Sequence, residues 1–182
     1  MEYSLKIQNL KKLKQAGVRI KVSQQHQHIF DIKFENGTLR IPTIIMNVTT
    51  EVVARNLIAF ERCHGTNNYI TDYFIVMNRL VDTEEDVELL IRYGILDTWL
   101  SDTKEIARAF NSTVQGCNFN PRKFYYKKLS KDLDHFCKTP CNKWKAILKR
   151  DYFNTPWAVI SFFAAILLLM LTIAQTVGTF VK

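Results

Sequence analysis

Three residues of types that bind zinc lie close together in the last third of the sequence. They are His135, Cys137 and Cys141, spaced as HxCxxxC, and Cys63 with His64 offers a distant second group. Structural zinc sites commonly contain close CxxC pairs, and the sequence has none. We therefore expect no metal site. The four cysteines remain open to interpretation as free thiols, a local disulfide or ordinary core residues, so they do not indicate a redox compartment.

Motifs for enzymatic chemistry are absent from the sequence. There is no Gly-rich phosphate loop, GxSxG elbow, HExxH helix or dinucleotide fingerprint. His26 and His28 belong to the polar run SQQHQH, which is typical of a solvated linker. We expect no catalytic residues and no cofactor, and thus a protein that is not an enzyme. A thiol- or zinc-dependent enzyme using His135, Cys137 and Cys141 stays as an alternative.

The strongest signal is an uncharged segment near the C-terminus. Residues 156–181 read PWAVISFFAAILLLMLTIAQTVGTFV, without a charged side chain. About 20 apolar residues suffice to cross a hydrocarbon core of roughly 30 Å. Pro156 suits the first turn of a helix, and Trp157 suits the membrane interface. We predict a transmembrane helix over 156–181 in a single-pass membrane protein.

The net charge of +8 is concentrated just before this segment. Residues 121–150 contain ten Lys or Arg against Asp132 and Asp134, whereas residues 1–120 and 151–182 are each neutral. We predict an amphipathic juxtamembrane helix over 143–155 that lies on anionic lipid headgroups. Its membrane-interface residues, with Trp157 from the span, are Lys143, Trp144, Lys145, Lys149 and Arg150. A plain topology signal explains the same charges equally well.

The charge distribution also predicts orientation and partners. The positive-inside rule places the N-terminal domain in the cytosol, since only Lys182 follows the span. If Met1 is the true start, the topology is that of a tail-anchored protein. The run RKFYYKKLSK interleaves aromatic and basic residues, as some nucleic-acid-binding segments do. Its closeness to the bilayer favours lipid, so we expect no nucleic acid and an unknown protein partner.

Three N-glycosylation sequons favour the opposite orientation. They lie at Asn36, Asn47 and Asn111, each with Thr two positions later. Asn36 also has a turn role, and Asn47 lies near a helix start.

Within the span, small residues at i, i+4 allow close helix approach and make a homo-oligomer a candidate: Ser161 and Ala165, Thr172 and Thr176, Ala174 and Gly178.

Outside the membrane segment, the pattern predicts a mainly α domain over 1–142 with one β-hairpin. The hairpin turns at Asn36 and Gly37, and Pro42 should confine its second strand to a sheet edge. We expect helices over 4–17, 51–63 with Val53, Leu57 and Phe60 on one face, 71–81, 84–93 and 101–115. Thr83 and Asp86 form a capping box, and two further helices should flank a break at Thr139 and Pro140.

Several long blocks carry a family resemblance. They are LRIPTI (39–44), RNLIAFE (55–61), YITDYFIVMNRLVDTEEDVELLIRYGIL (69–96) and KWKAILKRDYFNTPWAVISFFAAILLLMLTIAQTV (143–177). Together they resemble the C-terminal portion of the plant family called domain of unknown function 247, whose members typically carry a longer upstream region.

The resemblance implies a single-pass membrane protein with a signalling or recognition role, and it supplies no site residues. Some members are linked to pollen self-incompatibility in grasses, which implies recognition and not catalysis. We thus expect a membrane-tethered interaction module. The alternative is an extracytoplasmic recognition protein of the self-incompatibility type.

Overall fold

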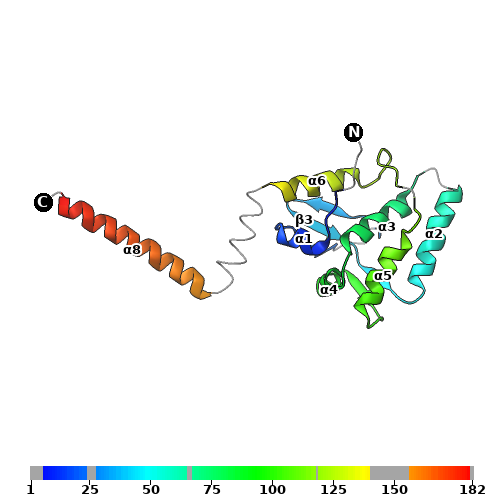
Figure 1. Ribbon diagram of the computed structural model, residues 1–182, viewed down its shortest axis with the longest axis horizontal. Helices are drawn as coiled ribbons and strands as arrows, with labels where there is room; N and C mark the ends of the chain where they lie inside the picture. The colour runs from blue at the N-terminus through cyan, green and yellow to red at the C-terminus, as the bar shows by residue number, and fades with distance from the viewer. Residues whose placement is uncertain (1–5, 24–27, 65–66, 118, 140–155, 181–182) are drawn as a thin grey trace.

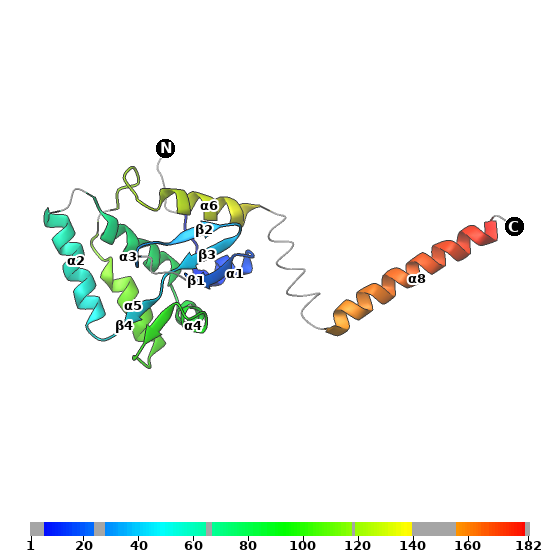
Figure 2. The ribbon, with the colours of Figure 1, turned by 180° about the vertical axis from the view of Figure 1, so that it is seen from behind.

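The computed structural model describes residues 6–23, 28–64, 67–117, 119–139 and 156–180 (Figures 1 and 2). These residues are mainly helical, with five short strands and a long apolar helix at the C-terminal end. The elements in chain order are α1 (Leu10–Gln15), β1 (Arg19–Val22), β2 (Lys33–Glu35), β3 (Thr38–Ile41), β4 (Ile44–Met46), α2 (Thr50–His64), α3 (Tyr69–Leu80), α4 (Glu84–Arg92), β5 (Leu96–Thr98), α5 (Thr103–Thr113), α6 (Lys127–Lys138) and α8 (Pro156–Phe180).

The predicted hairpin forms, within a larger sheet than expected. Strands β2 and β3 pair antiparallel around Asn36 (φ 50°) and Gly37 (φ 72°). Strand β1 then pairs parallel with β3, which gives the order β1-β3-β2. The prediction that the second hairpin strand lies at an edge was therefore wrong, because β3 is the central strand. It ends at Ile41, so Pro42 lies just beyond the ladder and removes no hydrogen bond within it.

Pro42 instead separates two strands that the sequence pattern had merged. The run TLRIPTIIM is divided into β3 and β4, and β4 pairs parallel with β5 in a second sheet of two strands. The backbone N–H of Ile44 donates to the carbonyl of Ile95 at 2.7 Å. One hairpin is thus an incomplete description of the β structure.

Helix α3 forms the centre of the helical part, and seven of its twelve residues are buried. Its Tyr73, Val76, Met77 and Leu80 join the main core, to which α1, α4, α5 and α6 also contribute. Helix α6 packs on β2, where the rings of Phe34 and Phe136 meet edge to face with their centroids 5.4 Å apart. Both views place α6 and α2 at well-separated positions of the domain (Figures 1 and 2).

The predicted helices are confirmed with different bounds. Helix α1 is shorter than expected because Asn9 caps it, its side chain accepting from the Lys12 N–H at 3.1 Å. Helix α4 matches its prediction within one residue, and its capping box is present. Helix α6 ends at Lys138, before the predicted break. The predicted second helix of the basic region, including 143–155, lies outside the described residues.

The apolar face predicted for α2 is present, and it is exposed. Ala54, Ile58 and Glu61 point into the protein, while Val53, Leu57 and Phe60 are exposed. The Glu61 carboxylate accepts from the backbone N–H groups of Ile70 and Thr71, both at 2.8 Å. These two bonds to the first turn of α3 keep the side of α2 that carries Glu61 facing inward. Hydrophobic periodicity does not predict this orientation.

Candidate functional site

Helix α8 is long and apolar enough to cross a membrane. Its segment Ile160–Gly178 has 19 residues with a mean hydropathy of 2.2, and none of the segment is buried against protein. Polar groups inside it bond along the helix, since the hydroxyls of Thr172 and Thr176 each donate to a carbonyl four residues earlier at 2.8 Å. Such bonds lower the cost of placing hydroxyls in hydrocarbon. The helix therefore has the length and composition that a membrane span requires.

The predicted interface residues flank this helix on its N-terminal side. Trp157 is exposed on the first turn of α8, where an interfacial aromatic residue would lie. Lys143, Trp144, Lys145, Lys149 and Arg150 lie outside the described residues.

A basic stripe covers the exposed face of α6, and sequence reasoning had not resolved it. Leu129, Ser130 and Leu133 are buried. The stripe consists of Lys128, Lys131, His135 and Lys138, which are all exposed and recur at i, i+3, i+7 and i+10. This spacing places them on one side of an α-helix. Lys138 pairs with Asp134 at 2.6 Å, whereas Lys128 and Lys131 form no ion pair within the described ranges.

The three sequons differ in accessibility. Asn36 is exposed in the hairpin turn, and Asn47 is exposed ahead of α2, where its side chain accepts from the N–H of Thr49 at 3.0 Å. Asn111 lies inside α5 and is half-buried. Its side-chain oxygen accepts from the side-chain amide of Asn78 at 2.6 Å. The asparagines of two sequons are thus exposed, while the third serves helix packing.

The candidate zinc ligands do not meet in the part of the chain that the structure describes. Cys63 is exposed, Cys117 and Cys137 are half-buried, and Cys141 lies outside the described residues. Burial raises the pKa of the Cys137 thiol, and the charge of Asp134 raises it further. No group of three His, Cys, Asp or Glu within the described ranges is arranged to hold a metal ion. Cys137 is therefore poorly suited to form a thiolate nucleophile.

Three carboxylates are buried, namely Glu61, Asp72 and Asp86, and only the capping role of Asp86 was predicted from the sequence. Each one accepts backbone N–H donors of another segment. Asp72 accepts from Tyr125 at 2.7 Å, and burial raises its pKa to about 6, with the charge of Glu61 adding to the effect. Because sequence spacing gives no sign of these distant donors, Glu61 and Asp72 resembled ordinary acidic residues on a helix face.

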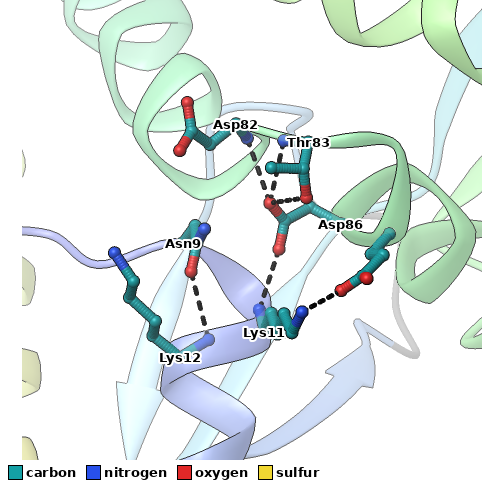
Figure 3. A network of polar contacts seen from close by, with 7 residues as sticks. Asn9, Lys11, Lys12, Asp82, Thr83 and Asp86 are labelled. Carbon is teal, nitrogen blue, oxygen red and sulfur yellow. Dashed lines mark hydrogen bonds and ion pairs between the residues drawn. The ribbon is translucent and has the colours of Figure 1, made fainter.

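Asp86 shows the same role most fully (Figure 3). One of its carboxylate oxygens accepts from the Lys11 N–H at 2.8 Å. The other accepts from the N–H groups of Asp82 and Thr83, at 3.2 and 3.0 Å, and from the Thr83 hydroxyl at 3.0 Å. An ion pair between Lys11 and Glu85 lies beside it. The buried acids therefore join segments of the fold, and this structural use accounts for them without a catalytic role.

An apolar cavity lies between β4, α2, α3 and α5. Its volume is about 280 Å³, and its wall includes Ile45, Met46, Ala54, Phe74 and Phe110. A second hollow between α2 and α5 is lined by Arg55, Arg62, Ser112 and Cys117. In that hollow Arg55 pairs with Glu51 at 2.7 Å, so part of its positive charge is compensated.

Comparisons with known proteins give a consistent result. The pattern of a family described as plant proteins of unknown function, domain of unknown function 247, matches residues 1–171. A putative UPF0481 protein of Arabidopsis thaliana is 31% identical over 94% of this chain and 32% of its own length. A second UPF0481 protein of the same plant is 23% identical over 93% of this chain and 36% of its own length. The chain thus spans about a third of these relatives, and no solved structure matches it.

Proposed function

Because this chain belongs to the plant family of unknown function designated domain of unknown function 247, we propose that it is a membrane-tethered interaction module and not an enzyme. In this proposal α8 spans the bilayer once, and the preceding domain binds a protein partner. The observation that carries the proposal is the bare apolar surface of Ile160–Gly178. A helix of that length with no protein around it is stable in hydrocarbon and aggregation-prone in water.

The basic stripe of α6 supports contact between the domain and anionic lipid headgroups. Only residues 139–155 separate Lys138 from the first residue of α8. Seventeen residues reach at most about 60 Å when fully extended, so the tether limits the distance between the stripe and the bilayer and allows the stripe to reach the surface. Each basic residue close to an anionic leaflet contributes about 1 kcal/mol. The stripe thereby extends the predicted headgroup contact of Lys143, Lys145, Lys149 and Arg150.

The excess of basic residues before α8 supports a cytosolic position for the domain. The exposed Asn36 and Asn47 favour a second candidate, an extracytoplasmic recognition protein of the self-incompatibility type. The two candidates require opposite sides of the membrane. They are therefore distinguishable by topology alone.

The test is a glycosidase mobility-shift assay on the full chain expressed in plant microsomes. The chain carries a reporter sequon on a C-terminal extension, and matched Asn36→Gln and Asn47→Gln variants serve as controls. We expect a shift from the extension alone, with the native sequons unmodified. Loss of mass that depends on Asn36 or Asn47 would reverse the orientation and favour the second candidate. Complete release of the chain by alkaline carbonate would exclude both.

A further inference from the structure

Exposed hydrophobic side chains are concentrated in one segment of the domain, which includes β4 and most of α2. Outside α8, eleven large hydrophobic residues within the described ranges are exposed, and six of them lie between residues 45 and 60. They are Ile45, Val48, Val52, Val53, Leu57 and Phe60. Single exposed hydrophobics are normal on a protein surface, whereas a group of this size marks an interaction site.

Three of the six form a continuous stripe along α2. Val53, Leu57 and Phe60 recur at i, i+4 and i+7 and are 51%, 42% and 62% exposed. On the same helix, Ala54, Ile58 and Glu61 face the core of the domain. A helix with apolar residues on both its inner and outer sides is typical of one buried between two layers. Helix α2 lies at the outer edge of the domain, with one layer in place (Figure 1).

The apolar cavity offers a hollow into which a hydrophobic side chain of a partner can insert. Ile45 belongs both to the exposed group and to the cavity wall, and the N-terminal half of α2 contributes Ala54 to that wall. The wall is mostly hydrophobic and includes the rings of Phe74 and Phe110. Binding hot spots are commonly apolar side chains inserted into such hollows.

The lengths of the relatives point to what covers this surface. About two thirds of each Arabidopsis relative has no counterpart in this chain, which matches them along almost its whole length. We infer that the α2 stripe and the adjoining cavity are the interface that binds this remaining portion of the family chain. In the relatives the contact is intramolecular, and the matched third by itself leaves this surface open to the remaining portion supplied as a separate chain.

This inference names a partner for the proposed interaction role, and it rests on the proposal that the domain binds protein. It does not depend on the proposed membrane tether. The first test uses an intact relative, the Arabidopsis protein that is 31% identical. A photo-crosslinking amino acid is placed at the position aligned with Leu57. A control probe is placed at the position aligned with Ile91, an exposed residue of α4. We expect the first probe to crosslink within the same molecule to peptides outside the matched third, and the control to give none.

Crosslinks from the Leu57 position only to the matched third, to lipid or to a second copy would overturn the inference. The second test uses the full 182-residue chain in nanodiscs, co-expressed with the non-matching portion of that relative. We expect Leu57→Asp with Phe60→Asp to lower co-purification at least tenfold, and Ile91→Asp to leave it unchanged. Co-purification insensitive to the stripe variant, or a stripe-dependent dimer of this chain alone, would also overturn it. A different protein partner bound elsewhere would remove this inference and leave the proposed function standing.

Discussion

The carboxylate of Asp86 accepts a 2.8 Å hydrogen bond from the backbone N–H of Lys11, 75 residues earlier in the chain. The same side chain closes the capping box of α4 through the Thr83 N–H. One buried acid thus starts one helix and fixes the position of another. This double use makes Asp86 a sensitive point of the fold.

Asp86→Ala is expected to destabilise the domain by about 3 kcal/mol, because it removes the acceptor of four partly buried hydrogen bonds that join α1 to the start of α4. Urea unfolding of the full chain in detergent micelles, followed by far-ultraviolet circular dichroism, measures the change. Asp82→Ala is the matched control, since the Asp82 side chain is exposed. We expect that control to stay within about 0.5 kcal/mol of the native protein. Equal stability of the two variants would contradict the assigned role.

Asp72 is expected to make stability fall as the pH rises from about 4 to 6. Its pKa is about 6 in the folded protein against 3.8 for an ordinary Asp, chiefly because of burial. The folded state therefore holds the proton more tightly, so the stabilisation is complete below pH 3.8 and is lost as the pH passes 6. The change amounts to about 3 kcal/mol at most.

Asp72→Asn tests this assignment, since the amide oxygen can still accept from the Tyr125 N–H. We expect the variant to be more stable than the native protein at pH 8, by about 1 to 3 kcal/mol, with a flatter profile between pH 4 and 6. Denaturant unfolding across this range measures both quantities. An unchanged slope would assign the pH dependence to another group.

Gly37→Ala is expected to destabilise the hairpin and its contact with α6. The glycine has a φ of 72°, and a Cβ there would lie 3.0 Å from the Phe136 ring. Gly94→Ala is the matched control, with a φ of 68° and open space around the new methyl group. We expect about 1 kcal/mol from the backbone alone at Gly94 and about 1 kcal/mol more at Gly37. Phe136→Leu in the Gly37→Ala background should recover part of the difference in thermal unfolding.

Charges placed in α8 are expected to release the chain from membranes. Leu169→Arg lies near the middle of the apolar segment Ile160–Gly178, and an arginine there costs about 3 kcal/mol. Adding Leu171→Arg should convert most of the chain to a form extractable by alkaline carbonate. Leu169→Val should remain in the membrane pellet. Retention of the double variant would mean that α8 is not the anchor.

Anionic lipid is expected to shield the basic stripe of α6. In nanodiscs containing phosphatidylserine, acetylation of Lys128 and Lys131 should slow about threefold or more relative to neutral nanodiscs. Salt at about 0.5 M should remove the difference, since it screens charges beyond a few ångströms. Lys104, exposed at the start of α5, is the internal control. Equal slowing at Lys104 would indicate a general change in reactivity and not a lipid-facing stripe.

Sequence reasoning succeeded where the deciding residues are neighbours in the chain. The capping box spans Thr83 to Asp86, and the hairpin turn needs only Asn36 and Gly37. Both features follow from local chemistry. The apolar character of α8 is likewise visible in one window.

It failed where distant residues decide. The parallel partner of β3 is the four-residue strand β1, and nothing in RIKV specifies that pairing. The inward face of α2 depends on Glu61 meeting donors at the start of α3. The basic stripe of α6 could have been found from its i, i+3, i+7 spacing, whereas the buried acids could not.

The parallel pairing of β4 with β5 has a consequence for the order of folding events. The chain leaves β4 at Met46, forms α2, α3 and α4, and returns at Leu96 to pair beside it. Closing so long a loop costs entropy before any β4–β5 hydrogen bond is gained. The three helices are therefore expected to assemble largely before the two strands meet, so this small sheet should close late on folding.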